Sequence, residues 1–291
     1  MPQAHSSETH RICLVRAGSH AYGLNREGSD EDYRGVFVAP PAEVIGLNPV
    51  DFHMISADHT LFEVRKFLKL CRECNPNIIE LLFSDGDNLL ETSPYWERIR
   101  ARREVFVTRL ARKTFSGYAM DQLRKIRSHY KYVNDPQPVA EPDPARYLRT
   151  KHIEGLGHKD VFDQNAYDDA RRTWKQYWEW KRKRNPDRAV LEEKFGYDTK
   201  HAMHLIRLLR MGGEILRGEG VQVMRADREE LLAIRSGALT YEELEAEAAR
   251  LEARLELDLA ISPLPETPDD GVIEALLLET YREYWRDKGL W

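Results

Sequence analysis

The sequence predicts a mixed α/β (α+β) protein, in which a small mixed β-sheet comes first and a larger helical part follows. Residues 11–38 contain two short apolar runs joined by a turn rich in glycine and serine, a pattern typical of strands. From residue 95 onward most segments favour helices. Four prolines among polar residues at 134–144 indicate a linker. We therefore expect two domains, residues 1–134 and residues 145–291.

Composition limits the class of protein. The chain has 291 residues, of which 42% are hydrophobic and 32% charged, as in soluble globular proteins. Its net charge of −5 supplies no global positive field, so any polynucleotide must bind a local basic patch. Three cysteines do not make a disulfide framework, the first ten residues are polar, and no apolar stretch approaches the ~20 residues of a membrane helix. We expect a cytoplasmic protein with no membrane partner.

The segment from Gly18 to Gly35 reads GSHAYGLNREGSDEDYRG and lies between the two apolar runs. Asp30 and Asp32 are two apart on the expected second strand, so their side chains point to the same face. Such a pair of carboxylates is favoured where a divalent cation lies between them, and Mg²⁺ prefers oxygen ligands and phosphate partners. Gly18 allows close approach of a phosphate, to which Ser19 offers a hydroxyl and an amide. The alternative is an acidic hairpin with solvated carboxylates.

These residues resemble the signature of the polymerase-β-like nucleotidyltransferase superfamily, a Gly-Ser turn followed by an Asp-x-Asp pair. Four blocks in order are similar to its RNA-repair-associated branch, found beside RNA ligases: GSHAYGL, SDEDYRG, CNPNIIELLF and GYDTKHAMHLIRLLR. They lie in patches between Arg11 and Arg235. The resemblance implies transfer of a nucleoside monophosphate from an NTP, such as ATP, to an acceptor hydroxyl, with Mg²⁺ or Mn²⁺ as cofactor. It also implies that the helical domain closes over a nucleotide bound to the first.

Asp58 follows an expected strand at residues 51–57 and precedes an amphipathic stretch in which apolar residues recur at helical spacing: Leu61, Val64, Leu68 and Cys71. By spacing alone, Asp58 is an ordinary N-cap of that helix. The superfamily carries a third acidic residue on a strand after the Asp pair, and Asp58 stands where that strand would end. Asp51 and Glu63 are rivals for the same role, although Glu63 is expected on the helix.

Glu80 lies inside an apolar run at residues 78–83. A carboxylate in such a run is either paired or facing the site, and we expect a salt bridge with a core arginine. Cys71 and Cys74 have the spacing of half a zinc motif, but no second cysteine pair or close histidine pair completes it. We expect these cysteines to be buried by packing.

A second informative segment, residues 196–210, predicts a helix that starts at Lys200 and is capped by Asp198 or Thr199. Offsets of four and three place three polar side chains on one stripe of this helix: Lys200, His204 and Arg207. An ordinary exposed helix face would look the same. Because the segment is one of the four blocks of the resemblance, we expect the stripe to contact a triphosphate or base.

Basic stretches at residues 98–127 and 181–184 favour RNA as the acceptor. Residues 147–187 are first irregular in pattern and then mix cations with four aromatic residues: Trp174, Tyr177, Trp178 and Trp180. Such a mixture can stack bases and hold phosphates. Packing of the aromatic rings on the core is the more ordinary arrangement and the one we expect.

In a nucleotidyltransferase the site residues take definite roles. Asp30, Asp32 and Asp58 hold the metal ions, and Asp58 also helps to activate the acceptor hydroxyl. Gly18 and Ser19 bind the β- and γ-phosphates, while Lys200, His204 and Arg207 contact the nucleotide. Arg34 is either a further phosphate contact or a structural bridge to Asp32.

The acceptor implied by the resemblance is an RNA 3′ end in need of repair, with an RNA ligase of the same pathway as a partner. A nucleotidyltransferase that modifies proteins, of the toxin or antitoxin type, would share this active site. A catalytically inactive nucleotide-binding regulator is the other alternative. Retention of Gly18, Ser19, Asp30 and Asp32 argues against it.

Overall fold

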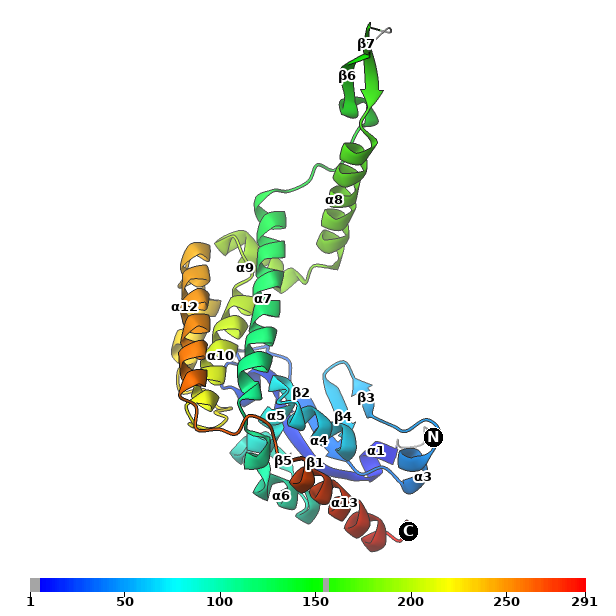
Figure 1. Cartoon of the computed structure of the whole chain (residues 1–291), viewed down its shortest axis with the longest axis vertical. Coiled ribbons are helices and arrows are strands. Elements are labelled where there is room, and N and C mark those ends of the chain that lie inside the picture. Colours follow the sequence, from blue (N-terminus) through cyan, green and yellow to red (C-terminus); the bar gives the residue numbers. More distant parts are fainter. Residues whose placement is uncertain (1–5, 154–156) are drawn as a thin grey trace. The chain divides into compact units, whose positions relative to one another are not determined.

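The computed structural model describes residues 6–153 and 157–291 and has the expected mixed α+β fold (Figure 1). It divides into two compact units. Unit 1 comprises the residues up to Gln122 and those from Met203 onward, and unit 2 comprises Leu123–Ala202. The units are bounded differently from the two expected domains. Whether residues 1–134 and 145–291 fold as separate domains stays a prediction. No helix among the described residues has the length and apolar character needed to span a membrane.

The sheet of unit 1 has five strands in the order β3-β4-β2-β1-β5. The strands are β1 (Arg11–Ala17), β2 (Asp32–Phe37), β3 (Phe52–Ser56), β4 (His59–Glu63) and β5 (Leu89–Glu91). β1 pairs antiparallel with β2 and with β5, and β2 pairs parallel with β4. The strands expected within residues 11–38 and 51–57 are therefore confirmed as β1, β2 and β3.

The sequence analysis did not anticipate β4. It expected a helix from Leu61, but the helix starts only at Val64. Leu61 and Glu63 are buried while the residues between and before them are half-buried, which is the alternation of a strand. Leu61 suits both a strand and the following helix, so the apolar spacing alone extended the helix too far. The parallel partner β2 supplies the hydrogen bonds that decide for a strand.

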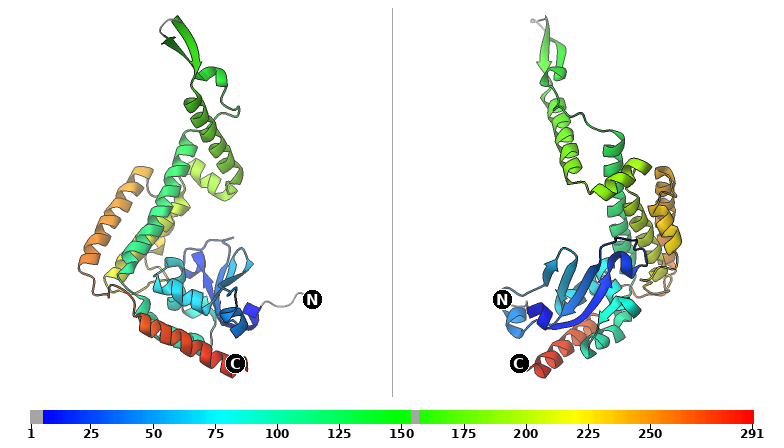
Figure 2. Two further views of the ribbon diagram at one scale, coloured as in Figure 1. Left: turned by 45° about the vertical axis from the view of Figure 1, so that its right-hand side comes forward. Right: turned by 180° about the vertical axis from the view of Figure 1, so that it is seen from behind.

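Helices α4, α6 and α13 pack beside this sheet (Figures 1 and 2). The Tyr281 hydroxyl of α13 donates to Glu63 at the end of β4, and the Trp285 indole N–H donates to the carbonyl oxygen of Ala39, 2.8 Å away. The helices that carry the sheet and its loops are α1 (Ser6–Thr9), α2 (Gly18–Ala21), α3 (Pro41–Ile45), α4 (Val64–Arg72), α5 (Pro76–Phe83), α6 (Pro94–Ala101) and α13 (Asp270–Asp287), with 3₁₀ turns at Gly86–Asn88 and Arg103–Phe106.

The remaining helices of unit 1 form a bundle. Arg112 of α7 pairs with Glu252 of α12 at 2.8 Å, and Ser116 donates to the same carboxylate. A β-carbon on Gly212 of α10 would come within 3.1 Å of Phe115, so the missing side chain lets α10 approach α7 closely. These helices are α7 (Leu110–Asn134), α10 (Thr199–Leu216), α11 (Arg228–Arg235) and α12 (Tyr241–Ala260), and the division between the units falls inside α7 and α10.

Unit 2 contains α8 and α9 together with a two-stranded antiparallel hairpin that adjoins the start of α8 (Figure 2). The elements are η3 (Pro144–Tyr147), β6 (Leu148–Ile153), β7 (Gly157–Phe162), α8 (Gln164–Lys183) and α9 (Pro186–Phe195). The described side chains of the hairpin are mostly exposed. The hairpin therefore lacks the alternation of apolar and polar residues from which its strands could have been predicted.

Candidate functional site

The turn after β1 fixes the position of one carboxylate. Ala17 pairs with Asp32 across the β1–β2 ladder, and Gly18 then turns the chain with a φ of 64°. A β-carbon on Gly18 would overlap Asp32 Oδ2 and stand 2.9 Å from Asp32 Cγ. Glycine therefore serves two purposes here: it adopts the left-handed conformation, and it leaves room for the carboxylate against the backbone of the turn.

A cavity of about 480 Å³ opens beside this turn. The end of β1 and the turn, β2, β4, the α4–α5 segment and α7 all contribute to its wall, and all belong to unit 1. Its lining residues are Ala17, Gly18, Tyr22, Asp32, Arg34, Thr60, Phe62, Leu70, Asn75, Asn77, Ile78, Glu80 and Tyr118. The parallel pairing of β2 with β4 is what brings Asp32 and Arg34 to the same wall as Thr60 and Phe62.

Asp30 and Asp58 are two positions in sequence from the lining residues Asp32 and Thr60, but neither lines the cavity itself. Asp30 precedes β2 by two residues and is exposed, so the strand expected to carry both aspartates starts at Asp32. Asp58 is exposed in the turn between β3 and β4, where its carbonyl oxygen accepts from the Tyr33 amide at 2.7 Å. Arg34 joins the two regions: it donates to the same carbonyl at 3.2 Å, and its Nη2 lies 3.9 Å from Asp32 Oδ1.

The rivals of Asp58 for the third carboxylate are engaged elsewhere. Asp51 is exposed and pairs with Arg65 at 3.2 Å and Lys66 at 3.6 Å. Glu63 is fully buried, accepts from the Arg65 amide at 2.8 Å and from Tyr281, and burial raises the pKa of its carboxyl group. Glu63, which ends β4, is the N-cap of α4. The N-cap alternative for Asp58 is therefore wrong.

A buried charged group forms one wall of the cavity. The Tyr22 hydroxyl donates to Glu80 Oε2 at 2.5 Å, and Arg207 Nη1 lies 2.9 Å from Glu80 Oε1. The guanidinium of Arg207 also lies over the Tyr22 ring, 3.8 Å from its centroid. The expected salt bridge between Glu80 and a core arginine is confirmed, with Arg207 as the partner.

The polar stripe expected on α10 is divided by burial. Arg207 is buried, whereas Lys200 and His204 are half-buried. Lys200 belongs to unit 2, while His204 and Arg207 belong to unit 1. The helix starts at Thr199, one residue before the expected Lys200, and Asp198, one of the two expected caps, accepts from the His201 amide at 2.9 Å. Contact of these three residues with a nucleotide stays a prediction.

Several lining residues escaped the sequence analysis as site candidates. Tyr22 lies in the GSHAYGL block and Asn75 in the CNPNIIELLF block, so the blocks themselves were the available signal. The Asn75 side-chain amide donates to the Tyr118 hydroxyl at 2.8 Å and thereby joins the start of α5 to α7. Tyr118 lies in a helix with no motif of its own.

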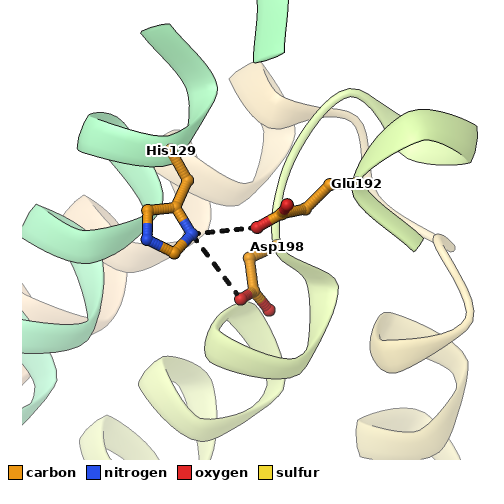
Figure 3. A group of neighbouring side chains, drawn as sticks. All are labelled: His129, Glu192 and Asp198. Atoms are coloured by element: carbon orange, nitrogen blue, oxygen red, sulfur yellow. Dashed lines mark hydrogen bonds and ion pairs between the residues drawn. The ribbon is translucent and has the colours of Figure 1, made fainter. Parts of the chain in front are cut away.

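A second cluster of ionisable groups lies in unit 2 (Figure 3). His129 Nδ1 lies 2.9 Å from Glu192 Oε1 and 3.9 Å from Asp198 Oδ2, and the three side chains are close enough to hold a metal ion. Both carboxylates already have guanidinium partners: Arg184 lies 2.5 Å from Glu192, and Arg188 lies 3.5 Å from Asp198. Two arginines balance two carboxylates, so ion pairing alone accounts for this cluster.

The oxygen donors beside the first cavity suit a hard divalent cation. Asp32 lines the cavity, and Asp30 and Asp58 each stand two positions in sequence from a lining residue, Asp32 and Thr60. The space that Gly18 leaves free at Asp32 is a cradle that any larger side chain would fill. Carboxylate oxygens of this kind, together with substrate phosphates, are the ligands that Mg²⁺ takes.

One protein family matches most of the chain. The model of a family described as the RNA repair pathway DNA polymerase beta family (RlaP) matches residues 1–277. An uncharacterized 38.9 kDa protein from the nrdC–mobD intergenic region of Enterobacteria phage T4 is 28% identical over 171 residues. That alignment covers 49% of this chain and 50% of the phage protein, so the chain spans about half the length of this relative. No solved structure matches the chain significantly.

Proposed function

The chain belongs to the RNA repair pathway DNA polymerase beta family, and from this premise we propose that it transfers a nucleoside monophosphate from an NTP to the 3′ hydroxyl of an RNA. The family points to a polymerase-β-like nucleotidyltransferase. The observation that carries the proposal is the carboxylate of Asp32, seated against the Gly18 turn at a cavity of about 480 Å³. Cavities of this size hold small-molecule substrates.

In the proposed site, Asp32 with Asp30 and Asp58 holds Mg²⁺ or Mn²⁺. The bound metal supplies a clamp for the attacking and leaving oxygens of an in-line displacement and neutralises phosphate charge. Asp30 and Asp58 are exposed and precede β2 and β4, the two parallel strands that contribute Asp32 and Thr60 to the cavity wall. Asp58 also takes the proton of the acceptor hydroxyl.

The turn and its surroundings bind the substrate. Gly18 exposes the backbone of the turn to the triphosphate, and Ser19 adds an amide and a hydroxyl. Arg34, which lines the cavity beside Asp32, offers a guanidinium to the phosphates. The apolar side chains of Phe62 and Ile78 provide a wall against which the base and ribose can lie.

The α10 residues take different roles in this proposal. Arg207 is committed to Glu80 and Tyr22, so it is a positioning residue that holds the Tyr22 wall of the cavity. Lys200 and His204 are the residues proposed to contact the triphosphate as the leaving pyrophosphate gains charge.

Nucleotidyl transfer tests the proposal directly. The purified protein is incubated with each α-phosphate-labelled NTP, Mn²⁺ or Mg²⁺, and an RNA with a free 3′ hydroxyl. We expect the label on the RNA, and none with Asp32→Asn. An RNA ligase of the same pathway is the proposed consumer of the repaired end. Label on a protein and not on RNA would replace RNA with a protein acceptor, and no transfer with any NTP would contradict the enzyme assignment.

A further inference from the structure

The two units carry opposite net charge. The sequence of unit 2 has 18 lysines and arginines against 13 acidic residues, a net charge of +5. Unit 1 has 26 basic residues against 36 acidic ones, a net charge of −10. The net charge of −5 for the whole chain is therefore the sum of a basic unit 2 and an acidic unit 1. A polyanion is attracted to unit 2 and repelled by unit 1.

A cavity of about 520 Å³ lies within this basic unit, and we call it the tryptophan pocket. It is lined by Val139, Trp174, Lys175, Trp178, Glu179 and Arg182. Five of these residues follow one face of α8 at intervals of one, three or four residues, while Val139 comes from the proline-rich segment. The pocket therefore lies between that segment and α8.

The two tryptophan rings of the pocket are held in place by one acceptor. The indole N–H groups of Trp174 and Trp178 donate to the carbonyl oxygen of Pro138, at 2.9 Å and 3.0 Å. The ring centroids lie 6.4 Å apart. Both polar atoms of the indoles are thus satisfied within the protein, and the surface that the rings offer to a ligand is apolar and aromatic.

The other aromatic residues of α8 behave as the sequence analysis expected. Tyr177 is buried, and Trp180 packs on Tyr132, with ring centroids 5.2 Å apart. The face with Trp174 and Trp178 is turned to a cavity. Packing on the core therefore explains two of the four rings and leaves the other two for a ligand.

Cations flank the tryptophan pocket, which Glu179 also lines. The Lys181 ammonium lies 5.0 Å from the centroid of Trp178. Lys175 and Arg182 line the pocket, and neither has an ion-pair partner within 4.0 Å among the residues that the structure describes. By contrast, Lys183 on the same helix is paired with Glu179 at 2.7 Å. Unpaired guanidinium and ammonium groups beside aromatic rings are the combination that binds single-stranded nucleic acid.

We propose that the tryptophan pocket binds unpaired nucleotides of an RNA strand, with a base against Trp174 and Trp178 and backbone phosphates on Lys175 and Arg182. This inference rests on the proposed function insofar as it takes RNA as the acceptor. Stacking explains why the site needs no base-specific hydrogen bonds, because every base has an aromatic face. The pocket is a docking site for the strand and is distinct from the cavity at Asp32.

Binding of a short, unstructured, fluorescently labelled RNA to the full chain tests the pocket. Trp178→Leu keeps the apolar volume but removes the ring, and we expect the affinity to fall about five- to 150-fold. Lys175→Gln and Arg182→Gln should each lower the slope of log affinity against log salt by about 0.7, the value for one phosphate contact on a single strand. Two matched controls should leave binding nearly unchanged: Arg172→Gln, a cation of α8 that is paired with Asp169, and Trp291→Leu, a tryptophan of unit 1 that is 81% exposed.

Further measurements separate this inference from the proposed function. Metal-dependent NTP binding, followed by calorimetry, should be the same in Trp178→Leu and the wild type, which also shows that the variant is folded. Asp32→Asn should abolish transfer and retain RNA binding. Wild-type protein that binds RNA through the pocket but transfers no nucleotide would overturn the proposed function alone. Unchanged RNA affinity and salt slope in all three pocket variants, or a pocket that captures a protein and no RNA, would overturn the inference.

Discussion

Asp32 Oδ2 overlaps the position that a β-carbon of residue 18 would take, so a larger residue at position 18 would require the carboxylate to move. Ala17, paired with Asp32 in the ladder, sets the two chains at this separation. The glycine of the turn is thus a steric condition for the position of the acidic group, in addition to its own backbone conformation.

Gly18→Ala should displace Asp32 and reduce nucleotidyl transfer by about 100-fold or more, since a misplacement of about 1 Å at a reacting centre has that effect. Gly28→Ala is the matched control. Gly28 has a φ of 76° but no atom within 4 Å of its β-carbon position, so it bears only the cost of the left-handed conformation, about 1 to 2 kcal/mol. Activity assays with thermal unfolding of both variants make the comparison. Equal loss of activity in both would refute the steric role.

The third carboxylate is identified by isosteric substitution. Asp58→Asn keeps the shape of the side chain and removes its charge, and the backbone carbonyl that accepts from the Tyr33 amide is unaffected. We expect turnover to fall by about 100-fold or more. Asp51→Asn should leave turnover nearly unchanged, since Asp51 pairs with Arg65 and Lys66 on the surface. The Mn²⁺ concentration at half-maximal rate, measured for both variants, reports on metal binding. The reverse order of the two effects would assign the role to Asp51.

The wall of the cavity at Asp32 should depend on the Glu80–Arg207 pair. Its side chains are 6% and 4% exposed, and loss of one partner from such a buried pair costs about 3–5 kcal/mol. We expect Glu80→Gln and Arg207→Met each to lower the free energy of unfolding by this amount, and the double variant to lose less than the sum. Urea unfolding measures all three. Additive losses, or single losses below about 1 kcal/mol, would show that the pair is not coupled.

Stability should fall in acid partly because of His201. Its Nε2 lies 2.7 Å from Arg188 Nη1 and accepts there, which requires a neutral ring. Burial, the largest cause, lowers the pKa of His201 from the usual 6.5 to about 4. As the pH falls from 6.5 towards about 4, the unfolded chain binds a proton that the folded chain does not, so the folded state loses stability. Above pH 6.5 both states are neutral and the effect vanishes.

His201→Gln should therefore flatten the pH dependence of the unfolding free energy in this interval, by an amount on the order of 3 kcal/mol. Urea unfolding at several pH values between 7 and 4 provides the measurement. His158→Gln, an exposed histidine of the same unit, is the control and should not change the profile. A profile for His201→Gln that is parallel to the wild type would contradict the assignment.

The sequence analysis recovered the parts of the fold that local pattern determines. The β1–β2 unit follows from two apolar runs around a glycine turn, and the start of α10 follows from the capping carboxylate of Asp198. β4 was missed because Leu61 fits two periodicities, so the expected helix took in a segment that pairs with both β3 and β2. The parallel pairing with β2 is long-range and leaves no local signal.

The sequence predicted which types of residue form the candidate site, but not which residues pair with one another. A buried partner for Glu80 was expected, but its identity could not be, because Arg207 is 127 positions away and no spacing rule links them. The rings of Trp174 and Trp178 were expected in the core. Their acceptor is Pro138, in a segment whose prolines indicated only a linker, so nothing in α8 itself distinguished them from Tyr177 and Trp180.

The separation in sequence between Glu80 and Arg207 also sets an order of events during synthesis. At about 5–20 residues per second, the arginine leaves the ribosome roughly 6–25 seconds after its partner, and all of unit 2 is made in between. During that interval Glu80 and Tyr22 lack the cation that they enclose in the finished protein. The cavity at Asp32 is therefore completed late in translation, and chains that terminate within unit 2 have the aspartates of the candidate site without its closed wall.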